Sequence, residues 1–313
     1  MTKPSKAQVF RQRLGSTLVL WTVVLLALFA PNDTVANTAF LAITSILGFV
    51  GFREFARMLE TTGVRVFLWP AMVAGSALLL FEVSHGWNTS RAIEEVSSSQ
   101  ISNAGSGQTH TTIYSATGIH FTLVTTLLFL WLSTLKLRSA GAVPIASLAL
   151  TFFGWFYVFG LLTFIAKIYY FPGLNGSWLL LYFILVTKFS DLGAYVTGSL
   201  IGRHKMAPKI SPGKTWEGFA GAIVISTLVS LITIYLAGPQ LAPLQGIHGV
   251  LLGILLGGLA VVGDLIESLL KRETGVKDSG NLFPGIGGCL DLLDSLLFNA
   301  PIFYLYCRLT LTN

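Results

Sequence analysis

Acidic side chains gather near the end of the sequence, where eight of the fourteen Asp and Glu residues fall between positions 191 and 294. Four of them form two pairs with a spacing of three residues, Asp264 with Glu267 and Asp291 with Asp294. This spacing places both members of a pair on one helical face. Carboxylates gathered without an equal number of buried cations favour a hard divalent ion, and we predict Mg²⁺ shared with substrate phosphates. Helix capping by Asp291 is the alternative for that one acid.

Basic and hydroxyl side chains accompany these acids. Ser268 and Lys271 follow Asp264 by four and seven residues, so a helix presents all three on one face. The glycine-rich segment 271–288 adds further charged residues: Arg272, Lys277 and Asp278. Acids and cations on one face predict a site at which anionic substrates meet a metal ion.

A similar face occurs upstream, where Lys188, Asp191 and Tyr195 are spaced by three and four residues. We predict a substrate-binding surface there, because a strongly basic segment follows. The alternative is a Lys–Asp pair that neutralises itself inside the bundle.

The basic segment 202–217 includes a string, Gly213-Lys214-Thr215, that is typical of a phosphate-binding P-loop. A P-loop requires a glycine where this chain has Pro208, and it follows a strand, so we reject that interpretation. We predict a cytoplasmic loop that holds polyphosphate by charge and hydrogen bonds. Its candidate binding residues are Ser211, Lys214, Thr215 and Glu217. A loop that is basic only because it is cytoplasmic is the alternative.

The elements that must position these side chains are predicted to be membrane helices. Hydrophobic residues make up 53% of the 313 residues, charged residues only 11%, and the mean hydropathy is +0.72. Soluble domains carry about 25% charged residues. We therefore predict an all-α, polytopic integral membrane protein of about nine spans, each approaching the roughly 20 residues needed. The spans are 16–30, 36–52, 66–82, 119–135, 142–166, 177–200, 217–237, 247–270 and 289–307.

Two regions of the chain differ in character. Residues 1–176 are predicted to be N-terminal transmembrane helices with a polar outside loop at 83–118. Residues 177–313 are predicted to be the catalytic transmembrane region, with cytoplasmic loops at 202–217 and 271–288. A charge inside a bilayer costs from about 2.5 to more than 10 kcal/mol, so the acids of the second region mark the functional part.

The distribution of Lys and Arg predicts a cytoplasmic N-terminus. With nine spans, sixteen of the 20 basic residues then fall in inside segments, as the positive-inside rule requires. The first apolar block is interpreted as a retained helix, because no convincing cleavage site follows it. The net charge of +6 is explained by these loops facing anionic lipids and solutes, without nucleic acid.

Residues 188–300 resemble the phosphatidate cytidylyltransferases, also called CDP-diacylglycerol synthases. The segments 190–195 and 210–218 are similar to two characteristic segments of that family, and 268–294 is similar to its signature. The matching signature residues are Ser268, Lys271, Arg272, Lys277, Asp278, Gly280, Pro284, Gly285, Gly287, Gly288, Asp291 and Asp294.

The resemblance implies a multi-helix membrane enzyme that joins CTP and phosphatidate into CDP-diacylglycerol and pyrophosphate for phospholipid biosynthesis, using Mg²⁺. It implies that Asp264 and Asp291 bridge the metal. The implied catalytic set is Asp264, Asp278, Asp291, Asp294 and Lys277. The predicted substrate-binding set is Lys188, Asp191, Ser211, Lys214, Thr215, Glu217, Ser268, Lys271 and Arg272. We expect the protein to lie in a bacterial inner membrane, with its active site facing the cytoplasm. Two further features are left open: a monovalent cation such as K⁺ beside the Mg²⁺, and assembly as a homodimer.

Two positions depart from the family pattern. Ile286 stands where the family has a histidine, and Leu292 stands where it has an arginine. Neither side chain can bind phosphate or transfer a proton, so a changed substrate and an inactive relative are alternatives. Two other functions stay open: a CTP-dependent lipid kinase of the polyprenol type, and a transporter whose buried acids form an ion pathway.

Overall fold

The computed structural model describes residues 6–99, 126, 145–285 and 287–311. The N-terminal helices are α1 (Lys6–Leu28), α2 (Asp33–Glu60) and α3 (Leu68–Ser99). In the middle of the chain, three segments form one continuous rod: α5 (Ile145–Trp155), the π-helical η2 (Phe156–Gly160) and α6 (Leu161–Tyr169). The C-terminal elements are α7 (Gly176–Ile201), α8 (Trp216–Ala237), the 3₁₀ helix η3 (Gly238–Leu244), α9 (Ile247–Glu273) and α10 (Cys289–Leu311).

Seven helical segments of the described chain are long and apolar enough to cross a membrane. They are Asp33–Glu60, Leu68–Ala92, Ile145–Tyr169, Gly176–Ile201, Trp216–Leu244, Ile247–Glu273 and Cys289–Leu311, and Gly15–Leu28 is a shorter apolar stretch. The all-α, polytopic prediction is thereby confirmed. The predicted span 119–135 lies outside the described residues except for Thr126, so the number of spans and the side of the N-terminus stay predictions.

Helix α3 extends beyond the apolar block from which it was predicted. The polar outside loop predicted at 83–118 is wrong for residues 83–99, which continue α3 as far as Ser99. Ala92, Ile93 and the following glutamates are compatible with a helix, and a helix that leaves the hydrocarbon needs no further apolar surface. The rest of that predicted loop, 100–118, lies outside the described residues.

The segment 202–217 forms an antiparallel hairpin where a loop was predicted. Its strands are β1 (Lys205–Ala207) and β2 (Ser211–Thr215), and Lys205 pairs with Thr215 while Ala207 pairs with Ser211. The string 213–215 belongs to β2 itself, so it does not form the loop between a strand and a helix that a P-loop requires. The hairpin places the basic residues of 202–217 at the end of the bundle.

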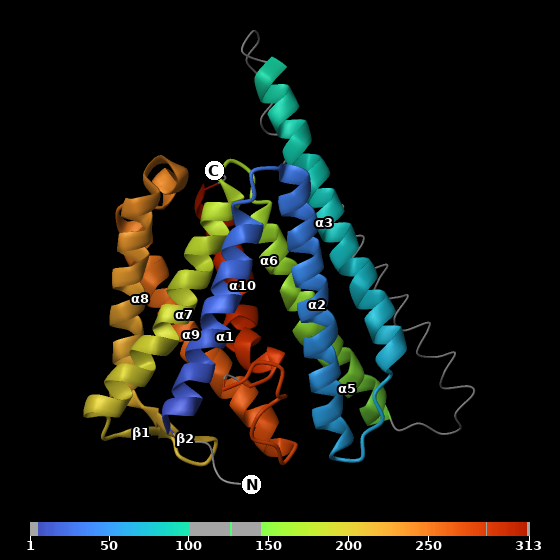
Figure 1. The fold of residues 1–313 in the computed structure, drawn as a ribbon, viewed down its shortest axis with the longest axis vertical. Helices are drawn as coiled ribbons and strands as arrows, with labels where there is room; N and C mark the ends of the chain where they lie inside the picture. The colour runs from blue at the N-terminus through green and yellow to red at the C-terminus, as the bar shows by residue number, and fades with distance from the viewer. Residues whose placement is uncertain (1–5, 100–125, 127–144, 286, 312–313) are drawn as a thin grey trace.

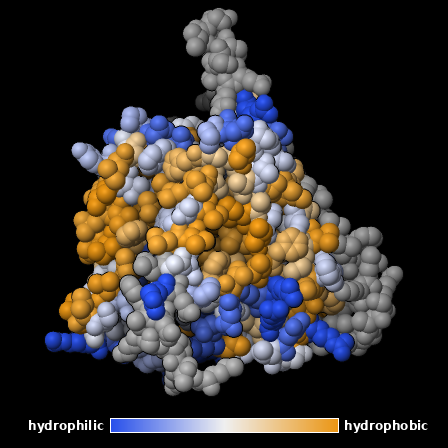
Figure 2. All heavy atoms as spheres, viewed as in Figure 1, coloured by the Kyte–Doolittle hydropathy of each residue, from blue (hydrophilic) through white to orange (hydrophobic). Residues whose placement is uncertain are grey.

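The helices are arranged so that two polar segments of the C-terminal region, the hairpin and the segment before α10, lie at the same end of the bundle (Figure 1). Helices α7, α8 and α9 pack against one another on one side, and α10 packs against α9, α6 and α7. The hairpin, the start of α1 and the segment 274–285 lie at one end, and α10 finishes at the other (Figure 1). Figure 2 shows hydrophobic residues across the middle of this face and hydrophilic residues near both ends, as expected of a membrane protein.

Small residues hold α8 and α9 close together. A Cβ atom at Gly253 of α9 would collide with the backbone of Thr227 on α8, and one at Gly257 would collide with the side chain of Ser226. The hydroxyl groups of Ser226 and Ser230 donate hydrogen bonds across the same contact, to carbonyl oxygens of Gly253 at 2.7 Å and Gly249 at 2.6 Å. Such close packing and interhelical hydrogen bonds replace the hydrophobic effect between membrane helices. They fix α9, which carries the central acids.

Candidate active site

Three carboxyl groups converge where α9 crosses α10. Asp264, Glu267 and Asp294 each offer one oxygen atom, and these atoms all lie within 4.8 Å of one another. Gly263 permits the approach, because a Cβ there would lie 3.1 Å from the carbonyl oxygen of Asp294 and 2.9 Å from Cβ of Phe298. Glu267 and Asp294 are buried, and Asp264 is half-buried. We call Asp264, Glu267 and Asp294 the acid group.

Glu267 has one carboxylate oxygen without a protein partner. Its Oε2 accepts a hydrogen bond from Nζ of Lys271 at 2.8 Å, whereas Oε1 is buried and has no hydrogen-bond partner. The side chain has no exposed surface. A buried charged oxygen without a partner costs free energy, and a ligand that supplies positive charge at the acid group would satisfy it. The helical spacing drew attention to Glu267, but the predicted site residues do not include it.

Two lysines flank the acid group from different elements. Nζ of Lys188, on α7, lies 3.8 Å from Oδ1 of Asp294, and Nζ of Lys214, on β2, lies 2.5 Å from Oδ2 of Asp264. Lys214 also donates to the carbonyl oxygen of Val261 at 3.2 Å, which ties the hairpin to α9. Both lysines were predicted from sequence, and the structure brings them to one place.

The predicted pair Lys188 and Asp191 does form, with 3.4 Å between Nζ and Oδ2. Ser295 of α10 joins it, accepting from Nζ of Lys188 at 2.9 Å and donating to Oδ2 of Asp191 at 3.0 Å. The pair is therefore more than a self-neutralising contact within one helix, since it reaches the acid group through Asp294. Tyr195, the third residue of this predicted face, is exposed.

Asp291 caps the start of α10. Its Oδ2 accepts hydrogen bonds from the N–H of Gly288 at 2.7 Å and from the N–H and hydroxyl of Ser279 at 3.0 and 2.9 Å. Its Oδ1 accepts from Lys271 at 2.7 Å. The hydrogen bond from the N–H of Gly288, the residue before the helix, to the Asp291 side chain corresponds to one half of a capping box. The structure thus bears out the capping alternative, and Lys271 links Asp291 to Glu267 without placing Asp291 in the acid group.

The charges around the site match a divalent cation. Five carboxylates, those of the acid group with Asp191 and Asp291, contact three lysines, 188, 214 and 271. If all are ionised, two negative charges remain uncompensated. Oxygen ligands and two surplus negative charges fit Mg²⁺, which binds one or two carboxylates and completes its shell with water or phosphate oxygens.

Several predicted binding residues make contacts that hold the hairpin and its neighbouring helices together. Glu217 accepts from the N–H groups of Arg203 and His204 and contacts Nδ1 of His204 at 2.6 Å, so it closes the base of the hairpin. Thr215 caps α8, its Oγ1 accepting from the N–H of Gly218 at 3.1 Å. Arg272 donates from Nε to the carbonyl oxygen of Ile210 at 3.2 Å and so joins α9 to the hairpin.

Of the remaining predicted residues, Ser268 lies beside the acid group. Ser268 donates to Oδ1 of Asp264 at 3.4 Å, which places its hydroxyl beside the acid group. Ser211 begins β2. Lys277 and Asp278 are exposed, and within the described part of the chain neither forms an ion pair. Ile286 lies outside the described residues.

Sequence reasoning missed Glu54, which anchors the segment before α10 from α2. Its Oε2 accepts from the N–H of Leu290 at 2.9 Å and from the hydroxyl of Ser279 at 3.2 Å. A Cβ at Gly280 or Gly288 would collide with this carboxylate, so both positions require glycine. The signal was an acid beside Arg53 and Phe55, just after the end of the predicted span 36–52. Glu54 therefore fixes the segment before α10, and Ser279 and Gly288 of that segment donate hydrogen bonds to Asp291.

We expect Glu54→Ala to lower the free energy of unfolding by about 1–3 kcal/mol, because the N–H of Leu290 loses its buried acceptor. The matched control is Glu60→Ala, which removes an exposed acid from the end of the same helix. Thermal unfolding in detergent measures the difference. Equal melting temperatures of the two variants would contradict the anchoring role.

Comparison with known proteins gives consistent matches. The model of the cytidylyltransferase family matches residues 11–310. A phosphatidate cytidylyltransferase of Haemophilus influenzae is 32% identical over 310 residues, covering 95% of this chain and 99% of that protein. The uncharacterized protein YnbB of Escherichia coli is 37% identical over 192 residues, 58% of this chain and 63% of YnbB. A phosphatidate cytidylyltransferase of Bacillus subtilis is 47% identical over 123 residues, 39% of this chain and 45% of that protein.

Proposed function

The chain belongs to the cytidylyltransferase family, and we propose that it is a phosphatidate cytidylyltransferase, which forms CDP-diacylglycerol and pyrophosphate from CTP and phosphatidate. The observation that carries the proposal is the acid group with its unpartnered Glu267 oxygen, flanked by Lys188 and Lys214. Acids for a cation and lysines for phosphates, side by side at one end of a membrane bundle, suit a reaction between a nucleotide and a lipid phosphate.

The acid group is proposed to hold Mg²⁺, with Glu267 and Asp294 joining the predicted ligand Asp264. Asp291 is assigned to the loop and to Lys271, because both of its oxygen atoms already accept hydrogen bonds there. When bound, Mg²⁺ supplies positive charge to phosphate oxygens. The site is proposed to face the cytoplasm, where CTP is available.

The proposed reaction is a displacement at phosphorus. A phosphate oxygen of phosphatidate forms a bond to the α-phosphorus of CTP, the bond to the bridging oxygen breaks, and pyrophosphate leaves with that oxygen. The nucleophile is already ionised at neutral pH, so the chain needs no general base and the replacement of the family's histidine by Ile286 removes no required proton transfer. The main obstacle is repulsion between two polyanions. Lys188 and Lys214 would lower it by holding positive charge in a fixed position.

The product of the reaction tests this function. The purified protein is incubated in detergent with phosphatidate, Mg²⁺ and CTP labelled on the α-phosphate, and the lipid fraction is separated by thin-layer chromatography. We expect a labelled CDP-diacylglycerol that requires Mg²⁺. The label disappears in Asp264→Asn and persists in Asp33→Asn, which removes an exposed acid near the start of α2.

Label transferred to lipid only from γ-labelled CTP would identify a lipid kinase and overturn the proposal. Absence of label from both forms of CTP, in a folded preparation, would overturn catalysis on phosphatidate.

A further inference from the structure

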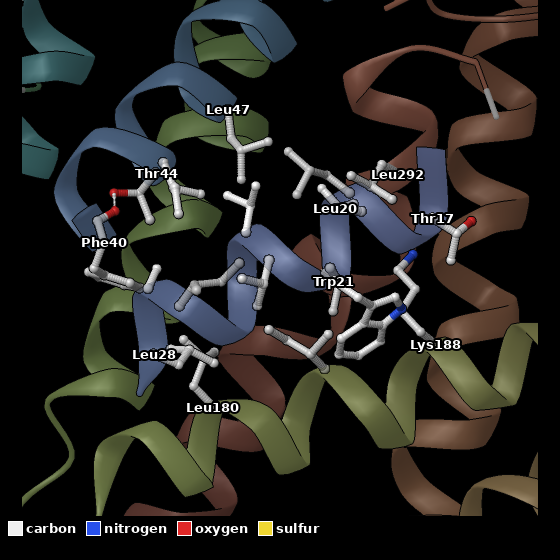
Figure 3. A pocket seen from close by; sticks show the side chains of 18 of the residues that line it. Thr17, Leu20, Trp21, Leu28, Phe40, Thr44, Leu47, Leu180, Lys188 and Leu292 are labelled. Atoms are coloured by element: carbon white, nitrogen blue, oxygen red, sulfur yellow. Dashed lines mark hydrogen bonds between the residues drawn. The ribbon is translucent and has the colours of Figure 1, made fainter. Parts of the chain in front are cut away.

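An apolar cavity of about 520 Å³ lies between α1, α2, α6, α7 and α10 (Figure 3). Its volume is within the roughly 300–1,000 Å³ of ligand pockets. Nearly all of its lining is Leu, Ile, Val, Phe, Ala and Trp. Figure 3 shows Thr17, Trp21 and Lys188 at one end, and Leu28 and Leu180 at the other. The cavity thus has a polar end with a lysine and an apolar end, where the one hydroxyl of the described lining, that of Thr44, donates to the carbonyl oxygen of Phe40.

The length of the cavity matches one acyl chain. Its lining on α1 runs from Thr17 to Leu28, a helical rise of about 16 Å. One leaflet of a hydrocarbon core about 30 Å thick, which a single acyl chain spans, is about 15 Å. The cavity therefore fits one extended hydrocarbon chain with its head near Lys188.

The polar end of the cavity is continuous with the acid group. Lys188 lines the cavity, and its Nζ lies 3.8 Å from Asp294 and 2.9 Å from Oγ of Ser295. Asp291 also borders it. Leu292 contributes an apolar wall where the family has an arginine, and it lies toward the Lys188 end (Figure 3). At this end, Lys188 is the one cation of the described lining that can meet an anionic head group.

We propose that this cavity holds one acyl chain of the lipid substrate, with the lipid phosphate beside Lys188 and the methyl end near Ala27 and Leu28. The proposal rests on the proposed function, since it names the place of the phosphatidate chain in that reaction. Charge complementarity selects the occupant: a lipid with an exposed phosphate monoester can pair with Lys188, whereas a zwitterionic bilayer lipid gains less. The apolar end of the cavity then limits the length of the acyl chain that can bind.

The first test shortens the cavity at its apolar end with Ala27→Phe, since Ala27 is buried and lines it. Dipalmitoyl and dioctanoyl phosphatidate are compared as substrates through kcat/KM. We expect the dipalmitoyl to dioctanoyl ratio to fall at least about tenfold, because only the longer chain reaches the added ring. Leu26→Phe is the matched control, because Leu26 is the neighbouring residue and is 69% exposed. This variant should have the same dipalmitoyl to dioctanoyl ratio as the unaltered protein.

An unchanged ratio in folded Ala27→Phe would overturn the proposal. The proposed function is tested separately, by the activity of the unaltered protein alone. A second measurement needs no activity: Ile43 lines the cavity, and Ile46 on the same helix is 59% exposed, so Ile43→Cys and Ile46→Cys are labelled with a maleimide. Dipalmitoyl phosphatidate should slow labelling of the Ile43→Cys variant several-fold more than dipalmitoyl phosphatidylcholine does. Equal protection by both lipids would mean that any bilayer chain fills the cavity, and the proposal would fail.

Discussion

Glu267→Gln is expected to lower kcat by about 10²–10³-fold and to raise the Mg²⁺ concentration that gives half-maximal rate. The substitution keeps the size of the side chain and removes one of the negative charges of the acid group. Glu267 contributes the buried oxygen that no protein group satisfies, so the neutral amide weakens the position that we assign to the cation. A magnesium titration of the initial rate, with labelled CTP, measures both effects.

The control for this prediction is Glu273→Gln, an exposed acid at the end of the same helix. It should leave the magnesium titration unchanged. If Glu267 served only to pair with Lys271, the Gln variant would be less stable but would require the same Mg²⁺ concentration when folded. That outcome would contradict the assignment of the acid group as the cation site.

Lys214→Met is expected to lower kcat/KM for CTP by about 10²–10³-fold, the cost of losing one preorganised charge that stabilises a developing anion. Methionine preserves much of the length of the side chain and removes its charge. Because Nζ of Lys214 lies 2.5 Å from Asp264, it also competes with any cation bound by that carboxylate. The variant should therefore require less Mg²⁺ while it uses CTP less well, and steady-state kinetics at several Mg²⁺ concentrations separates the two effects.

Lys209→Met is the matched control, since Lys209 is an exposed cation between the two strands of the hairpin. It should change neither parameter by more than about twofold, as expected of a screened surface charge. If Lys214 only neutralised Asp264, its loss would lower the Mg²⁺ requirement without affecting the use of CTP. That result would remove Lys214 from the substrate site.

The predictions that failed concern the end of one candidate span, Leu68–Ala92, with the residues that follow it, and a segment between two spans. Residues 83–99 continue α3, and 202–217 contains a hairpin. Hydropathy identifies which residues must be covered by lipid. Beyond the bilayer, water can form hydrogen bonds with the backbone groups of either a helix or a loop. Local propensity and contacts with the rest of the bundle then decide the structure, and one-dimensional patterning carries little of that information.

The sequence by itself determined the membrane class, most helix positions and the acids worth attention, because apolar runs of about 20 residues and three-residue spacing are local properties. It also carried the pattern by which the family was recognised. Only the tertiary structure decided which acids form one group. Asp294 joins Asp264 and Glu267 because α9 and α10 cross at Gly263, whereas Asp291, one turn away, faces the loop that Glu54 anchors from 225 residues earlier in the chain. Contacts between segments so distant in sequence depend on how helices pack, and no spacing within one helix specifies that packing.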